Sequence, residues 1–170
     1  MAFVVETGAG LADSNSFASV AEADAYFSDR GVTAWGSLTT AVKQTSLIKA
    51  TDYLEATYSQ AWIGDKVSLA QALSFPRTNM VSEGFYLPSD EVPNRVVYAT
   101  IEMALRASTG EVLISDQSQQ IVKEKVDVIE TTYSEFSDPA QRYPYVNKLL
   151  SALLNTFTGG NFASAQTVRT

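Results

Sequence analysis

Cysteine and histidine are both absent from the 170-residue sequence. Without cysteine, the chain has no disulfides, no thiolate nucleophiles and no cysteine zinc sites. Without histidine, it lacks the most common general base, the usual partner of a catalytic serine and the most common metal ligand. An enzyme of this composition would depend on carboxylates, lysine, tyrosine and serine. We therefore expect a protein that is not an enzyme and holds no cofactor.

Positive charge is also scarce, since 12 Lys and Arg stand against 19 Asp and Glu, for a net charge of −7. Nucleic-acid-binding surfaces are usually basic, so this balance disfavours one. No apolar run approaches the roughly 20 residues of a membrane span, and the first residues do not resemble a signal peptide. The composition, 45% hydrophobic, suits one domain with a sizeable core. We expect a soluble protein made in a cytoplasm.

Three weak chemical signals remain. Gly8-Ala9-Gly10 is not followed by Lys-Ser/Thr, so it does not match a phosphate-binding loop. Asp52 and Glu55 lie one helical turn apart and could reach one metal ion, although acidic pairs on helices usually face solvent. A Ser–Lys dyad is formally open, because serine is plentiful and four lysines are available: Lys43, Lys49, Lys66 and Lys148. Each lysine, however, sits in a pattern typical of a helix surface or a loop.

Helical periodicity dominates the rest of the sequence. Ser19-Val20-Ala21-Glu22 is a capping box, and apolar residues then recur every three or four positions. A long helix that is apolar nearly all round indicates a central position in the fold. Trp35 is expected to pack in the core. The expected helices run from Ser19 to Gly31, from Thr39 or Thr40 to about Tyr58, from Ser89 with Pro93 in its first turn to Gly110, and from Pro144 to about Leu154.

These patterns predict a mainly α fold, a four-helix domain over residues 17–155 with a small β-hairpin at about 119–135. Alternating residues in 119–135 favour that hairpin. Residues 59–90 read as a long loop, which is typical of a functional or partner-ordered segment. Residues 1–16 are expected to form an extended N-terminal arm.

The C-terminal segment, 156–170, is nearly uncharged and carries two phenylalanines. It is either a tail that docks on a partner and orders there or an unstructured end. The docking hypothesis rests on its anchors, its hinge and its single charge: Phe157, Gly159, Gly160, Phe162, Val168 and Arg169.

An ordered set of short motifs runs through most of the chain. The motifs are Val5–Gly8, Ala12–Phe17, Ala21–Phe27 with Arg30-Gly31, Trp35, Ile48–Leu54, Gln71–Arg77, Pro88–Pro93, Val122–Val126 and Tyr143-Pro144. In this order, over residues 5 to about 154, the chain resembles the head-to-tail connector adaptors of long-tailed, siphophage-type bacteriophages.

The resemblance implies a virion structural protein of the neck, made in the host cytoplasm. It implies a ring of twelve copies, with the portal protein above and a stopper or tail-completion protein below, and no contact with a membrane. Double-stranded DNA would pass through the channel during packaging and ejection without sequence-specific binding. On this basis the tail would dock on the portal. The hairpin residues Lys123, Glu124, Lys125 and Asp127 would face a neighbouring ring or the channel.

A second function comes from the same resemblance, because homologues of this pattern are also labelled DnaT-like single-stranded-DNA-binding proteins. The alternative is therefore a replication accessory protein. Such a protein needs a basic groove with stacking aromatics. Lys123 and Lys125 form the one close basic pair, and Glu124 lies between them. A hydrolase is a more distant third hypothesis for the function.

Overall fold

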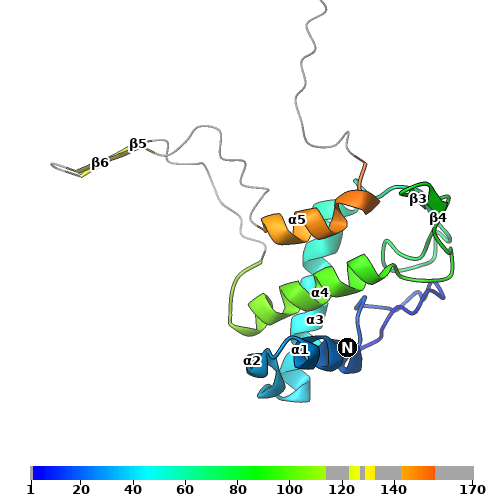
Figure 1. Ribbon diagram of the computed structural model, residues 1–170, viewed down its shortest axis with the longest axis horizontal. Coiled ribbons are helices and arrows are strands. Elements are labelled where there is room, and N and C mark those ends of the chain that lie inside the picture. Colours follow the sequence, from blue (N-terminus) through cyan, green and yellow to red (C-terminus); the bar gives the residue numbers. More distant parts are fainter. Residues whose placement is uncertain (1, 114–122, 127–128, 133–142, 156–170) are drawn as a thin grey trace, which may run out of the picture.

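The computed structural model describes residues 2–113, 123–126, 129–132 and 143–155 (Figure 1). Within these residues it contains five α-helices and one short 3₁₀ helix. The helices are α1 (Val20–Asp29), α2 (Thr33–Gly36), α3 (Thr40–Tyr58), α4 (Asn94–Ser108), α5 (Pro144–Leu150) and the 3₁₀ helix η1 (Ser151–Leu153). The strands are β1 (Asp65–Lys66), β2 (Arg77–Thr78), β3 (Val81–Ser82), β4 (Phe85–Tyr86), β5 (Lys123–Val126) and β6 (Ile129–Thr132).

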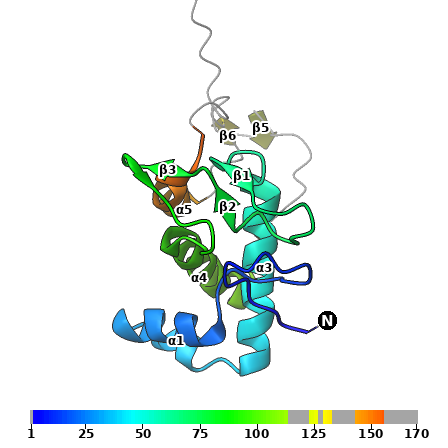
Figure 2. The same ribbon diagram turned by 90° about the vertical axis from the view of Figure 1, so that its right-hand side faces the viewer.

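Helix α3 is the long axis of the helical domain. Figures 1 and 2 both show α1, α4 and α5 stacked one above another along one side of α3. Helix α4 lies in the middle of that stack, and eight of its fifteen residues are buried. This confirms the prediction that the nearly all-apolar helix is central. Trp35 is 1% exposed, as expected for a core residue.

The mainly α class is confirmed, with two differences from the expected count. The described residues form five α-helices rather than four, because Thr33–Gly36 makes one extra turn, α2, around Trp35. They also form three antiparallel strand pairs rather than one hairpin, namely β1–β2, β3–β4 and β5–β6. The two additional pairs lie in the segment predicted as a loop. None of the described helices is long and apolar enough to cross a membrane.

The two helix starts predicted from local capping residues, at Ser19 and Thr39, are confirmed. The Ser19 hydroxyl accepts a hydrogen bond from the Glu22 backbone N–H at 3.1 Å, and the Glu22 carboxylate accepts one from the Ser19 N–H at 2.7 Å. Thr39 caps α3 in the same way through the Val42 N–H. The capping box therefore forms as predicted.

Two helix boundaries differ from the prediction. Helix α4 begins at Asn94 rather than Ser89, because Pro93 takes extended dihedral angles as the N-cap and a proline disfavours helix in the residue before it. Helix α5 ends at Leu150. The chain then tightens into η1 and becomes extended at Leu154, which forms a β-bridge with Trp62.

Residues 2–16, predicted as an extended arm, fold back on themselves. Val5 bridges to Ser16, the Asn15 N–H donates to the Val4 carbonyl, and the Glu6 N–H donates to the Ser16 carbonyl. The chain folds back because the buried carboxylate of Glu6 collects the N–H groups of the intervening loop. Residues 2–16 therefore form a closed loop in the structure.

The hairpin predicted at 119–135 has a described counterpart in the pair β5–β6. Lys123 pairs with Thr132, Glu124 with Thr131 and Lys125 with Glu130. Asp127 and all six residues of the docking hypothesis for the C-terminal tail lie outside the described residues. Their proposed contacts, and the domain boundaries at 16 and 155, remain predictions.

Candidate functional site: interaction surfaces

The long segment 59–90 is held in shape by a buried arginine. Arg77 is 8% exposed. Its guanidinium donates three hydrogen bonds to backbone carbonyls: to Ile63 at 2.9 Å, to Gly64 at 2.5 Å and to Ser74 at 3.3 Å. Burial lowers the pKa of Arg77 from its ordinary value. The fork of five N–H donors lets one side chain fix three separate points of an irregular backbone.

Two further polar side chains complete this scaffold. The Gln71 amide donates to the carbonyls of Leu73 and Pro76 at 2.9 and 3.0 Å. The Glu55 carboxylate accepts from the Ser74 N–H and hydroxyl at 2.9 and 2.8 Å, which ties the segment to α3. Glu55 therefore holds a loop instead of joining Asp52 at a metal ion. Among the described residues no group of three or more acidic side chains is placed to hold one.

The β3–β4 hairpin projects apolar side chains from this scaffold. Val81, Phe85 and Tyr86, which we name the hairpin tip, are 47%, 75% and 81% exposed. Met80, directly before β3, is 1% exposed and anchors the hairpin in the core. Glu83 and Gly84 form the two-residue turn with φ of 54° and 85°, as a type I′ turn requires.

The hairpin tip is also fixed to the helical stack. The Glu83 carboxylate accepts from the Arg95 guanidinium at 2.9 Å, and Arg95 lies in the first turn of α4. Val81 pairs with Tyr86 across the strands, and Ser82 pairs with Phe85. Because side chains alternate along a strand, Val81 and Tyr86 share one face of the hairpin and Phe85 lies on the other.

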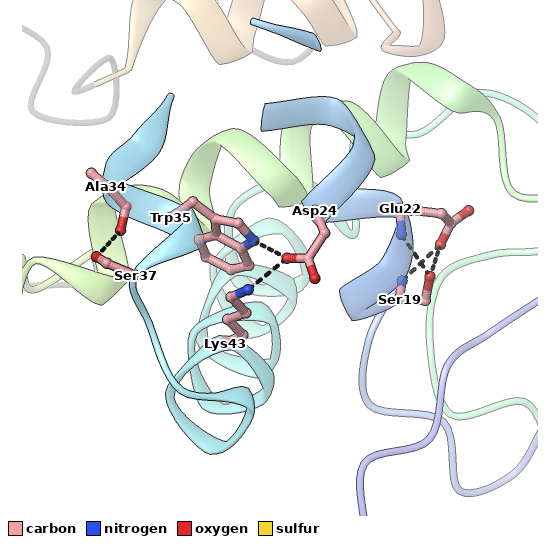
Figure 3. Close-up of polar contacts among 7 residues, drawn as sticks. All are labelled: Ser19, Glu22, Asp24, Ala34, Trp35, Ser37 and Lys43. Carbon is pink, nitrogen blue, oxygen red and sulfur yellow. Dashed lines mark hydrogen bonds and ion pairs between the residues drawn. The ribbon is translucent and has the colours of Figure 1, made fainter. Parts of the chain in front are cut away.

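A cleft of about 390 Å³ lies at the other end of the domain, between α1, α2 and the start of α3. Figure 3 shows Asp24, Trp35 and Lys43 meeting there. One oxygen of Asp24, Oδ1, accepts from both Trp35 Nε1 and Lys43 Nζ at 2.8 Å. Lys43 is 8% exposed, so it is a buried ion-pair partner and not the helix-surface lysine the sequence predicted. Its ammonium faces a carboxylate, which does not match a Ser–Lys dyad.

A third surface involves tyrosines of α1, α4 and α5. The Tyr26 hydroxyl donates to Glu102 at 2.8 Å, and both burial and that carboxylate raise the pKa of Tyr26. The Arg30 guanidinium lies 3.4 Å from the centre of the Tyr26 ring. Tyr98, 38% exposed, packs against Tyr26 with ring centres 5.1 Å apart, and Tyr145 is 53% exposed. We name Tyr98, Tyr145 and Arg30 the tyrosine face.

Most cations of the described helical domain, residues 2–113 and 143–155, already have a structural role. This part carries eight Lys and Arg against thirteen Asp and Glu. Arg77, Lys43 and Arg95 are engaged as described above, Arg30 stacks on Tyr26, and Arg106 lies over the Tyr143 ring at 5.4 Å. The remaining three, Lys49, Lys66 and Lys148, form no ion pair with another described residue. Such a surface does not present the basic groove that phosphate binding requires.

Sequence reasoning singled out the segment 59–90 as a whole but not the exposed residues of the hairpin tip. The length and turn residues of 59–90 indicated a functional loop, yet nothing singled out Val81, Phe85 and Tyr86. The turn residues Glu83-Gly84 between two apolar pairs were the available signal.

These features define a small helical protein with exposed aromatic side chains. A family model described as "Putative DnaT-like ssDNA binding protein" matches residues 1–170, and the chain belongs to this family. No curated protein and no solved structure matches the chain. The family agrees with the alternative function drawn from the resemblance, and none of the comparisons supports the head-to-tail connector.

Proposed function

We propose that the protein is a structural, non-enzymatic adaptor that joins other proteins, acting as a head-to-tail connector in the neck of a bacteriophage virion. The observation that carries this proposal is the hairpin tip. Its side chains are largely exposed, while the residues beneath them are buried and hydrogen-bonded. Ordered, exposed aromatic side chains are enriched where proteins bind one another.

The charge distribution supports the same proposal. A connector must let double-stranded DNA slide through its channel, so its surface must not hold phosphate groups. The described helical domain has more acidic than basic residues, and most of its cations are engaged internally. A ring of such copies would repel the DNA backbone rather than bind it.

The partners follow from the resemblance. They are further copies of the chain in a ring of twelve, the portal protein above and the stopper or tail-completion protein below. Portal docking remains assigned to the tail anchors Phe157 and Phe162 with their neighbours. By the same resemblance, four hairpin residues would face the channel or an adjacent ring: Lys123, Glu124, Lys125 and Asp127.

The second candidate function is single-stranded-DNA binding in replication, and the whole-chain family match favours it. The tyrosine face supplies a physical basis for it. Tyr98 and Tyr145 are exposed, and Arg30 already stacks on an aromatic ring. Bases stack on such side chains with about 1–3 kcal/mol each and without sequence preference.

Fluorescence anisotropy with a labelled oligonucleotide separates the two functions. As a connector, the protein should show no saturable binding at physiological salt. A dissociation constant below about 1 μM, weakened in Tyr98→Ala and Tyr145→Ala but not in Phe85→Ala, would overturn the connector proposal and establish the second candidate.

A phage-level experiment tests the connector directly. Deleting the gene from the phage that carries it should leave DNA-filled heads without tails in electron micrographs. Complementation with a Phe85→Ser, Tyr86→Ser double variant should fail in the same way, while Lys66→Ser should restore tailed particles. Normal particles combined with reduced DNA synthesis would refute the proposal.

A further inference from the structure

The cleft between α1, α2 and α3 could accept a further side chain. The Asp24 side chain is 46% exposed. Trp35 and Lys43 both donate to its Oδ1, and no described residue donates a hydrogen bond to its Oδ2. The cleft is lined by Phe27 and Val32 beside the buried Trp35 ring. An aromatic ring with a hydroxyl at its end would find apolar walls and a free acceptor there.

The hairpin tip offers such a group. Tyr86 is 81% exposed and lies on the same face of the hairpin as Val81. Figures 1 and 2 place the hairpin and the α1–α2 end at opposite ends of the domain. A copy therefore cannot fill its own cleft, and a contact between the two surfaces must join two copies.

The dimensions of the cleft suit one aromatic side chain. Its volume of about 390 Å³ falls in the range of pockets that hold small ligands, so it has room for a tyrosine ring. The tyrosine hydroxyl supplies the donor that Asp24 Oδ2 lacks, and its ring can pack on Trp35.

We propose that Tyr86 of one copy docks in the α1–α3 cleft of the next copy, with its hydroxyl donating to Asp24. Because the two surfaces differ, the contact is heterologous, and repetition closes a ring when the rotation between copies allows it. The inference rests on the proposed function in one respect, that the hairpin tip is a protein-binding surface.

The contact is weak by itself. A tyrosine buries at most about 150–250 Å², far less than the roughly 800 Å² per partner of a stable interface. The isolated protein should therefore be monomeric, and the contact should persist only where copies are held side by side.

A tandem fusion of two copies through a flexible Gly/Ser linker supplies this proximity, since such linkers give effective concentrations in the millimolar range. The chain contains no native cysteine, so introduced cysteines report one contact. Val81→Cys places a thiol on the Tyr86 face of the hairpin of the first copy, and Ser28→Cys places one at the cleft of the second. Ser151→Cys, exposed on η1, is the control position. Cross-linking is followed with a short bifunctional maleimide.

The hairpin–cleft pair should cross-link about tenfold faster than the hairpin–η1 pair, which corresponds to about 1.4 kcal/mol of docking free energy. Adding Tyr86→Ala to the first copy should remove this difference. Phe85→Ala removes an equally exposed aromatic side chain from the other face and should preserve it. Equal rates for the two pairs, or a rate unaffected by Tyr86→Ala, would overturn the inference.

The outcome for tail attachment separates this inference from the proposed function. If Tyr86→Ala leaves cross-linking unchanged but still blocks tail attachment, the hairpin tip binds a different protein, and only the inference fails. If phage carrying Tyr86→Ala and Phe85→Ala together produces normal tailed particles, the proposed function of the hairpin tip fails.

Discussion

Replacing Glu6 with glutamine tests whether the N-terminal loop belongs to the folded domain. The Glu6 carboxylate is 2% exposed. Its Oε1 accepts from the N–H groups of Gly8 and Gly10 at 2.8 and 3.0 Å. Its Oε2 accepts from the Leu11 N–H at 2.8 Å and from the Ser14 hydroxyl at 3.2 Å. All four contacts need an acceptor, and glutamine offers only one oxygen.

In Glu6→Gln the amide oxygen can keep one pair of contacts, while the amide NH₂ faces the other pair. The facing Leu11 N–H then loses its acceptor and meets another donor. Hydrogen bonds to charged groups contribute about 1.5–3 kcal/mol each, so losing two predicts a decrease of about 3–6 kcal/mol in the free energy of unfolding. That is a large part of the roughly 5–15 kcal/mol total for a domain.

Urea unfolding followed by far-UV circular dichroism at neutral pH measures this decrease. Glu22→Gln is the matched control, because Glu22 is exposed and accepts from the Ser19 N–H in a capping box. Glutamine also serves at that capping position, so Glu22→Gln should change the free energy of unfolding by less than about 0.5 kcal/mol.

A Glu6→Gln protein as stable as wild type would refute this reasoning. The N-terminal loop would then detach without affecting the rest of the domain, as the predicted extended arm would. Equal losses in both variants would show that the effect follows from removing a negative charge, whether the carboxylate is buried or exposed.

Two other predictions concern charged groups that the fold removes wholly or partly from water. Arg77→Met should lower the free energy of unfolding by about 3–5 kcal/mol, because three buried carbonyls lose their donor. Arg95→Met is the control: it removes an exposed ion pair and should lower the free energy of unfolding by at most about 1 kcal/mol. Thermal unfolding compares the two variants. Partial desolvation raises the pKa of Asp52 above its ordinary value of 3.8, so the folded state binds this proton more tightly than the unfolded state. The free energy of unfolding should therefore decrease as the pH rises from the unfolded-state pKa through the higher folded-state pKa. Asp52→Asn should therefore be more stable than wild type at pH 7 and equal to it below pH 3.8 in a pH series of urea unfolding.

Local contacts explain which parts of the fold the sequence predicted. The Ser19–Glu22 capping box and the Thr39 cap join residues three positions apart, so the pattern contains both partners. The buried face of α4 follows from its own periodicity. Helix α2 escaped prediction because four residues are too few to show a period.

Distant polar contacts explain what the sequence did not predict. Asp24 meets Lys43 nineteen residues away, and Glu55 meets Ser74 at the same separation. Charged residues are expected at the surface, so a buried Lys43 and Arg77 run against the general rule. The hairpin tip became a candidate site only once Met80 and Arg77 were seen to hold the backbone beneath it.

Because Lys43 and Arg77 are buried and hydrogen-bonded within the domain, few cations are left to contact DNA phosphates. Salt-dependent affinity arises when free Lys and Arg displace counterions from phosphates, and the slope with salt counts those contacts. Arg77 and Lys43 are buried, so neither can contribute. Binding by the described domain would rely on stacking at Tyr98 and Tyr145 and would depend only weakly on salt. A steep salt dependence would instead place any DNA contact outside the described helical domain, whose free cations are too few to produce it.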